Sequence, residues 1–395
     1  MPSVAVIGAG AAGCFCAARL REVVPEVDVT VLEAAARPMA KLAVTGGGRC
    51  NLTNDFQGIR SLEEAYPRGH RLMQRALRVF SPERTVEWFR QHGVPLVLQD
   101  DHCWFPRSQD AMDVVRCLQG SMQGASLRLH TPVTSVLPGP DGQMLVNGEP
   151  FSFAVITTGG APKGLPFLDG LYLELVPPVP SLFTFRIPDS DLTALMGLVT
   201  QATLSLPGTG FRAQGPLLIT DWGLSGPATL KLSSYAARHL SDAGYKGSVA
   251  VNWLALPEAD VRSLLQRLAA ENPQKQLSTV HPLQARLWAH LMQRSGLRPD
   301  IRWAELGTKG LNRLTATLTQ DTYPLAGKSR FREEFVTAGG VALDNLNLNT
   351  LESKRHRGLY FAGEVLDVDA ITGGFNLQAA WSTGYVCAQS IVNSL

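Results

Sequence analysis

The apolar positions at the start of this chain form short runs separated by a helical segment, which is typical of α/β proteins with a parallel sheet. Residues 4–7 are apolar and rich in β-branched side chains, and residues 27–32 form a second strand-like run. Good helix formers occupy residues 11–23 between them. Two more apolar strands are expected at residues 153–160 and 358–364. The beginning and the end of the chain therefore share one pattern.

The middle of the chain follows a different pattern. After a proline-rich stretch at residues 176–180, short alternating strands such as 202–206 and 247–251 take over. Apolar residues then recur at helical spacing in residues 257–268 and 281–292. We therefore expect the middle to fold as a β-rich segment followed by a helical one.

Composition places the chain among large globular proteins. With 395 residues and 45% hydrophobic side chains, it can bury a large core divided into two or three compact units. No run approaches the roughly eighteen apolar residues that a membrane-spanning helix requires, and no cleavable apolar leader precedes the first strand. We therefore expect a cytoplasmic protein without a membrane partner. The net charge of +2 is too small to indicate a nucleic-acid partner by itself.

The cysteines show no pattern of a metal or disulfide framework. They are scattered, and none forms a CxxC pair or a Cys/His array with zinc spacing. We expect no structural metal and no disulfide. The six residues are Cys14, Cys16, Cys50, Cys103, Cys117 and Cys387.

A dinucleotide fingerprint follows the first predicted strand. Gly8 permits a tight turn, Gly10 lets the backbone approach a pyrophosphate, and Gly13 lets the helix pack on the strand. Glu33 ends the next strand, where an acid can accept hydrogen bonds from ribose hydroxyls and would repel a 2′-phosphate. The pattern predicts an adenine dinucleotide but leaves FAD and NAD open, because both carry the same adenosine and pyrophosphate. The glycine run is Gly8, Ala9, Gly10, Ala11, Ala12 and Gly13.

Two later segments favour FAD. Small residues follow the strand at 153–160, an acid follows the strand at 358–364, and a glycine pair then opens a C-terminal helix. Together with the fingerprint, these segments resemble the flavoproteins of the glutathione-reductase class. The resemblance implies that the acid contacts the ribityl or pyrophosphate part and that the helix start faces the flavin, where its partial positive charge stabilises reduced flavin. The residues concerned are Thr158, Gly159, Gly363, Glu364, Gly373, Gly374, Phe375 and Asn376.

The most specific motif is residues 41–54, which we call the signature loop. Its three glycines followed by Arg-Cys-Asn resemble the loop of the BaiN/YhiN-like (RdsA-type) FAD-dependent flavoproteins, and residues 220–227 and 339–369 are also similar to that family. The chain departs from the family at Thr45, where serine is usual, and at Asp221, where histidine is expected.

This resemblance spans nearly the whole chain and implies a fold. We expect an α/β protein with a Rossmann-like FAD-binding domain on a parallel sheet, interrupted by an inserted β-barrel-like and helical unit. The FAD domain is expected at residues 1–180 and 331–395. The inserted substrate domain is expected at residues 181–330, with a β-rich part at 181–255 and a helical part at 256–326.

The signature loop supplies the candidate chemistry. Consecutive glycine N–H groups and the Arg49 guanidinium are expected to cradle an FAD phosphate or a substrate anion. Cys50 lies beside that positive charge, which favours a thiolate, so it is a candidate redox or proton-donating residue; the alternative is a packed small side chain. The expected cofactor contacts in this loop are Lys41, Gly47, Gly48, Arg49, Cys50 and Asn51.

The inserted helical region carries an excess of basic residues. A solvated helical face explains it most simply, and a patch that binds RNA or an anionic substrate is the alternative. Between residues 258 and 332, the sequence contains twelve basic and six acidic residues. The basic residues are Arg262, Arg267, Lys275, Arg286, Arg294, Arg298, Arg302, Lys309, Arg313, Lys328, Arg330 and Arg332.

These observations predict an FAD-dependent oxidoreductase that transfers hydride between flavin N5 and an unsaturated substrate. The insert has no second glycine fingerprint, so NAD(P)H would act as a transient reductant, or electrons would come from another protein. The resemblance also implies an alternative, because members of the family are implicated in reducing unsaturated steroids and in making dihydrouridine in ribosomal RNA. A third possibility is a flavin-binding module without catalysis.

Overall fold

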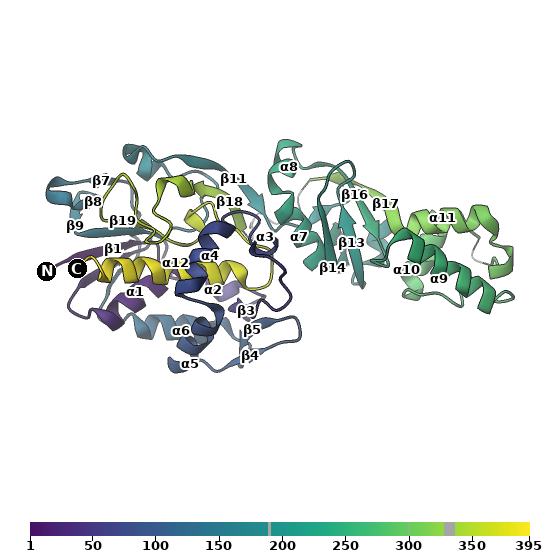
Figure 1. The fold of residues 1–395 in the computed structure, drawn as a ribbon, viewed down its shortest axis with the longest axis horizontal. Coiled ribbons are helices and arrows are strands. Elements are labelled where there is room, and N and C mark those ends of the chain that lie inside the picture. Colours follow the sequence, from purple (N-terminus) through teal and green to yellow (C-terminus); the bar gives the residue numbers. More distant parts are fainter. Residues whose placement is uncertain (189–190, 299, 328–335) are drawn as a thin grey trace. The chain divides into compact units, whose positions relative to one another are not determined.

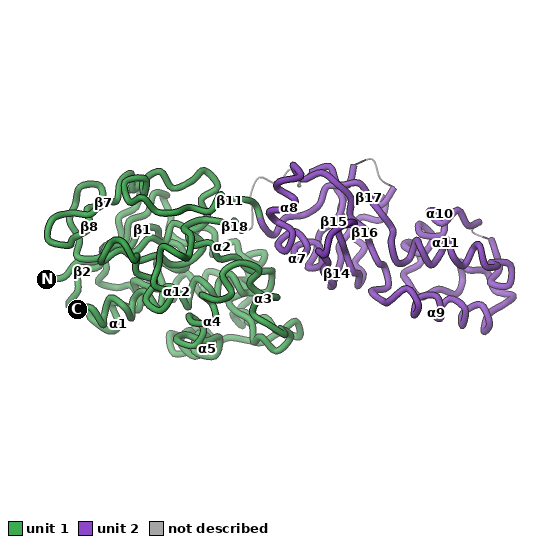
Figure 2. The backbone as a smooth tube through the Cα atoms, turned by 45° about the horizontal axis from the view of Figure 1, so that its top comes forward, with its two compact units in different colours: residues 1–180, 336–395 green, residues 181–335 purple. Residues whose placement is uncertain are grey.

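The chain folds into two compact units. The computed structural model describes residues 1–188, 191–298, 300–327 and 336–395. Unit 1 consists of residues 1–180 and 336–395, and unit 2 consists of residues 181–335 (Figure 2). The chain therefore leaves unit 1 once and returns to it. The expected return point at residue 331 lies outside the described residues.

Unit 1 is built on a parallel sheet whose strands come from both ends of the chain (Figure 1). β1 lies at its centre, with β10 on one side and β2 on the other. β19 pairs with β10 and closes one edge, while β6 pairs with β2 at the opposite edge. The strands are β1 (Ser3–Ile7), β2 (Asp28–Leu32), β6 (Ser126–Arg128), β10 (Phe153–Ile156) and β19 (Leu359–Phe361).

Two helices from opposite ends of the chain pack side by side in unit 1. They are α1 (Ala11–Val23) and α12 (Phe375–Val392). Their contact is close, because a Cβ added to Gly384 would lie 2.7 Å from the backbone oxygen of Ala12. The other helices of this unit are α2 (Ala40–Val44), α3 (Leu62–Ala65), α4 (His70–Val79), α5 (Pro82–Gln91) and α6 (Ala111–Ser121).

Small sheets complete unit 1. The first joins the signature loop to a hairpin in the order β3-β5-β4, the second is a meander of β7, β8 and β9, and the third pairs β11 with β18. The strands are β3 (Thr53–Asn54), β4 (Leu96–Leu98), β5 (Cys103–Pro106), β7 (Val136–Pro138), β8 (Met144–Val146), β9 (Glu149–Phe151), β11 (Leu175–Ser181) and β18 (Val336–Val341).

Unit 2 contains an antiparallel sheet in the order β12-β15-β14-β13-β16-β17. Its two ends approach each other, because the N–H of Arg186 in β12 donates to the oxygen of Gly327, just beyond β17, at 3.1 Å. The sheet is therefore barrel-like. The strands are β12 (Phe185–Arg186), β13 (Val199–Ser205), β14 (Arg212–Thr220), β15 (Gly223–Ser225), β16 (Lys246–Asn252) and β17 (Asp321–Ala326).

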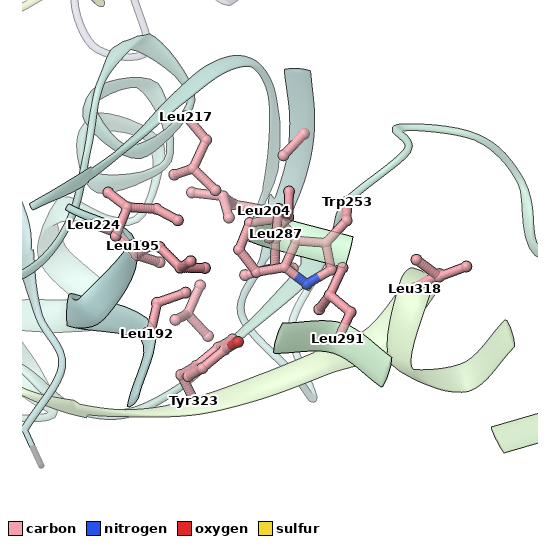
Figure 3. Close-up of a cluster of buried hydrophobic side chains, with 14 of the residues drawn as sticks. Leu192, Leu195, Leu204, Leu217, Leu224, Trp253, Leu287, Leu291, Leu318 and Tyr323 are labelled. Atoms are coloured by element: carbon pink, nitrogen blue, oxygen red, sulfur yellow. The ribbon is translucent and has the colours of Figure 1, made fainter. Parts of the chain in front are cut away.

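The sheet and the helices of unit 2 share one hydrophobic core. Leu204 of β13 packs with Leu287 and Leu291 of α10 around the indole of Trp253, which is fully buried (Figure 3). The β-rich and helical segments are therefore packed around a single core. The helices are α7 (Pro227–Tyr235), α8 (Ala237–Asp242), α9 (Glu258–Glu271), α10 (Ala285–Arg294) and α11 (Gly307–Gln320).

Candidate cofactor site

The parallel sheet of unit 1 brings the predicted cofactor residues to one edge. Gly8 follows β1, Glu33 follows β2, Thr158 comes shortly after β10, and Gly363 comes shortly after β19. These strands are parallel, so their carboxyl ends meet at the same edge of the sheet. The strand order also changes direction at β1, and ligands of open α/β sheets bind at such a switch point.

Glycine is required at two positions of the first turn by packing within the protein. A Cβ on Gly13 would lie 2.1 Å from the oxygen of Gly8 and 2.5 Å from Oγ1 of Thr157. Gly8 has φ +106°, and a Cβ there would lie 2.6 Å from the oxygen of Thr157. Gly10 is different, because a Cβ at this position would meet nothing within 4 Å. The turn therefore leaves open space at Gly10, directly before α1.

The N-terminal ends of α1 and α12 carry no side-chain cap. Neither helix has an acidic residue in its first turn. Their first N–H groups and the positive ends of their dipoles therefore remain available to an anion. Ala11 begins α1, and buried Ala12 packs against Gly363, whose added Cβ would lie 2.8 Å from that of Ala12. The first N–H groups of α1 and the space at Gly10 fit the phosphates of an FAD.

Glu33 is held in place by the backbone. Its Oε2 accepts the N–H of Ala9 at 2.8 Å, and its Oε1 accepts the N–H of Ala35 at 2.8 Å. The first bond ties the end of β2 to the glycine turn. A carboxylate oxygen has more than one acceptor site, so both oxygens can also accept a ribose hydroxyl.

Glu364 lies beside Lys41 although the two residues are far apart in the sequence. Lys41 Nζ lies 3.7 Å from Glu364 Oε2, and the lysine side chain is 73% exposed, so the pair contributes little to stability. Glu364 Oε1 accepts the N–H of Thr337 at 2.8 Å. Gly159 lies next to this carboxylate, since its added Cβ would be 3.6 Å from Oε2. The lysine, the acid and the glycine therefore form one polar cluster.

Thr157 is a structural residue of the site that sequence reasoning missed. Its Oγ1 donates toward the oxygens of Ile7 and Gly8, at 2.9 and 2.8 Å, and so supports the glycine turn. Thr158, which the sequence selected, is exposed. A threonine at the end of a strand carries no distinctive pattern, so only the pairing of β10 with β1 reveals its contact.

The signature loop holds the start of α12. The Asn54 side-chain amide donates to the oxygen of Gly373 at 3.0 Å. The Asn51 amide, oriented to donate to Thr53 at 3.2 Å, accepts the N–H of Gly374 at 3.2 Å. The Thr53 hydroxyl donates to Gln378 Oε1 at 2.6 Å. The side chain of Asn51 thus supports the loop.

The first side chains of α12 are also engaged within the protein. Phe375 is only 3% exposed and packs edge-on against Phe56, with ring centroids 4.9 Å apart. Its carbonyl accepts the hydroxyl of Tyr66 at 2.9 Å. The Asn376 side chain hydrogen-bonds both the N–H and the oxygen of Ala370, at 2.9 and 3.0 Å. These residues therefore present backbone N–H groups, rather than side chains, to a ligand.

The centre of the signature loop has left-handed backbone geometry. Gly46, Gly47 and Gly48 have φ of +61°, +69° and +81°, and an added Cβ on Gly47 or Gly48 would meet nothing within 4 Å. The Arg49 guanidinium lies 4.6 Å from the Phe105 ring centroid and donates to the Gly46 oxygen at 3.3 Å. The arginine is therefore held against the hairpin of β4 and β5.

The expectation that Arg49 would favour a thiolate at Cys50 is wrong. Cys50 is fully buried, and burial raises the pKa of its thiol to about 12. The loss of solvation outweighs the charge that is adjacent in sequence. At neutral pH the side chain is a protonated thiol inside the protein.

The structure describes nine of the twelve basic residues that the sequence places in the insert. Lys328, Arg330 and Arg332 lie outside the described residues. Arg294 forms an ion pair with buried Asp321 at 2.6 Å. The charge of Arg294 is therefore compensated within the insert.

The described parts of the chain contain neither a membrane-spanning helix nor a cluster of candidate metal ligands. No helix there combines the length and apolar character needed to span a bilayer. Across the same residues, no three or more His, Cys, Asp or Glu side chains gather in a group that could hold a metal ion.

Comparison with known families gives the same fold. The family model described as the HI0933-like protein Rossmann domain matches residues 2–390. The chain belongs to this HI0933-like family. The predicted resemblance and the predicted α/β fold class are thereby confirmed, as is the prediction of an FAD-dependent oxidoreductase.

Two relatives of this HI0933-like protein align with nearly its full length. A ribosomal RNA dihydrouridine synthase of Escherichia coli is 30% identical over an alignment 414 residues long, gaps included. The alignment covers 98% of this chain and 97% of the relative. A 3-dehydro-bile acid delta(4,6)-reductase of Clostridium scindens is 27% identical over 415 residues, covering 99% of each.

A solved structure supports the fold alone. The 3-ketosteroid delta1-dehydrogenase of Sterolibacterium denitrificans matches with a TM-score of 0.50 at 12% identity, and the match covers 100% of each chain.

Proposed function

We propose that the protein reduces a carbon–carbon double bond conjugated to a carbonyl group, with FAD as the hydride source. The observation that carries this proposal is the sheet edge that joins the open turn at Gly10, the uncapped start of α1 and the Glu364 cluster. The uncapped start of α12 is held nearby by the signature loop. When bound there, FAD supplies hydride chemistry from N5.

Different residues of this site would bind different parts of FAD. Gly10 and the first N–H groups of α1 would bind the pyrophosphate, and Glu33 would accept hydrogen bonds from the ribose. Glu364 would contact the ribityl or pyrophosphate portion. The start of α12 would stabilise negative charge on the flavin, because its first turn has neither a side-chain cap nor an acidic residue.

The chemistry of two relatives supports a conjugated double bond as the reacting group. One relative is named for making dihydrouridine and the other for reducing a 3-dehydro-bile acid. In uracil the 5,6 double bond is conjugated to a ring carbonyl, and an unsaturated 3-keto steroid has the same arrangement. An electron-poor alkene of this kind accepts hydride at its β-carbon and a proton at its α-carbon.

Uridine in ribosomal RNA is our specific substrate proposal. It is supported by the 30% identity over nearly the whole length of both this chain and the dihydrouridine synthase. Such a substrate would place the reaction in the cytoplasm. NAD(P)H is the proposed reductant and would bind transiently, since the glycine turn at β1 is assigned to FAD.

The test combines a spectrum, a reaction and a cellular product. The purified protein is expected to show flavin absorbance, and NAD(P)H oxidation is expected to accelerate with an enone or with ribosomal RNA. Dihydrouridine in ribosomal RNA is measured in cells with and without the gene. A protein that cannot be reconstituted with FAD would overturn the proposal, while unchanged dihydrouridine would remove only the RNA substrate.

A further inference from the structure

A pocket with two arginines lies beside the hairpin of β4 and β5 in unit 1. Its volume is about 450 Å³. We call it the arginine pocket, and no acidic residue lines it. It lies where α5 ends and β4 begins, and it is lined by Arg90, Gly93, Pro95, Leu96 and Arg107.

Both arginines of this pocket are positioned without being neutralised. The Arg90 guanidinium lies 5.1 Å from the Trp104 ring centroid, and a guanidinium over an aromatic ring keeps its N–H groups free for other acceptors. Arg107 is anchored through its backbone, whose N–H donates to Pro95 at 2.8 Å. Within the described residues, neither guanidinium forms an ion pair or a hydrogen bond with a side chain.

In the part of the chain that the structure describes, no nearby acid forms an ion pair with these arginines. Glu87, one turn before Arg90 on α5, accepts a hydrogen bond from Gln91 at 3.2 Å. Asp100 and Asp101 lie at the tip of the hairpin, beyond the pair of Leu98 with Trp104. At about 3.3 Å per strand residue, the tip is more than about 10 Å along the hairpin from the pocket. The charged residues that line the pocket are therefore both basic.

We propose that the arginine pocket binds phosphodiester groups of an RNA substrate. This inference rests on the proposed ribosomal RNA function. Two guanidinium forks match phosphate oxygens, and contacts of this kind fix the position of RNA without reading its sequence. RNA fits better than a dinucleotide, because a dinucleotide pyrophosphate is normally held by a glycine turn before a helix, and the pocket lining offers none.

The test compares two double variants of the FAD-loaded full chain. R90Q/R107Q removes both pocket charges. R116Q/R128Q removes the same formal charge from arginines that already pair with Asp113 and Glu149, at 2.6 Å each. Binding to protein-free ribosomal RNA is measured across a salt series, and flavin absorbance and thermal unfolding are recorded for all proteins to exclude misfolding.

The pocket variant is expected to bind RNA more weakly, with the slope of log K against log salt reduced by about 1 to 2. The control variant should stay close to wild type. Equal losses in both variants would overturn the proposal, and so would weaker NADPH binding with RNA binding unchanged. Measuring dihydrouridine in cells distinguishes failure of the pocket proposal from failure of the proposed RNA function. If dihydrouridine depends on the gene but is unchanged by R90Q/R107Q, only the pocket proposal is rejected. If dihydrouridine does not depend on the gene, the RNA function itself is rejected.

Discussion

At the scale of single residues, Gly10 and Gly13 differ in how much space the protein leaves for a side chain in the same turn. G13A would place a methyl group 2.1 Å from a backbone oxygen, so we expect it to destabilise the protein by about 3 kcal/mol. G10A meets no atom within 4 Å, and Gly10 has an ordinary φ of −84°, so its stability should stay within about 1 kcal/mol of wild type. FAD affinity should nevertheless fall in G10A, because the methyl group would occupy the proposed pyrophosphate space.

Two measurements separate these effects. Thermal unfolding of the apoprotein reports stability, and titration with FAD reports affinity. If G10A binds FAD as tightly as the wild type does, the pyrophosphate does not bind at Gly10. The protein would still be an FAD-binding protein.

The roles of these glycines follow from local geometry, which is why the sequence predicts them. The state of Cys50 does not, because its burial depends on contacts that no nearby residues encode. Thr157 was missed for the same reason, since its hydroxyl contacts residues about 150 positions away. The role of a single residue can therefore be predicted from the sequence where local backbone geometry requires that residue type. It cannot be predicted where the role depends on burial or on contacts with residues distant in the sequence.

At the scale of elements, the start of α12 depends on neighbours from the first part of the chain. The segment before α12 is tied to the segment before α4 by an ion pair between Arg68 and Asp369. Asp369 is fully buried, and the Arg68 side chain is 15% exposed. This pair and the signature loop therefore hold the loop from which α12 begins.

Removing Arg68 tests this support. R68M leaves the buried Asp369 carboxylate without the guanidinium, so we expect a loss of about 3 to 5 kcal/mol of unfolding free energy. R75M is the control, because Arg75 lies exposed on α4 and, among the residues that the structure describes, its side chain donates only to Asn349, at 2.9 Å. Its effect should be within about 0.5 kcal/mol. Denaturant unfolding measures both. Equal stabilities would mean that the ion pair does not support the loop.

Elements with strong apolar patterns could be predicted well. The helix expected at 11–23 is α1, and the strand expected at 153–160 contains β10, which ends four residues earlier at Ile156. The helix expected from residue 281 begins only at Ala285, after Pro282. β3 and β4 were not predicted, because strands of two or three residues are too short to show a period.

At the scale of the whole molecule, unit 2 is inserted through neighbouring strands. The chain leaves unit 1 along β11 and returns along β18, and these two strands form one small sheet. Their backbones are close, since a Cβ on Gly339 would lie 2.5 Å from the oxygen of Pro177. A short connection could therefore replace the insert without displacing the sheet of unit 1.

This arrangement predicts that unit 1 folds and binds FAD without unit 2. All the proposed cofactor residues lie in residues 1–180 and 336–395, and the core of unit 2 is formed by its own residues. A variant in which a short Gly/Ser linker replaces residues 181–335 should be soluble and should bind FAD within about tenfold of the wild-type affinity. Absorbance and FAD titration measure this, with G13A in the same shortened chain as the control that should not fold stably. An insoluble or colourless variant would mean that unit 2 contributes to the stability of unit 1 or to its cofactor site.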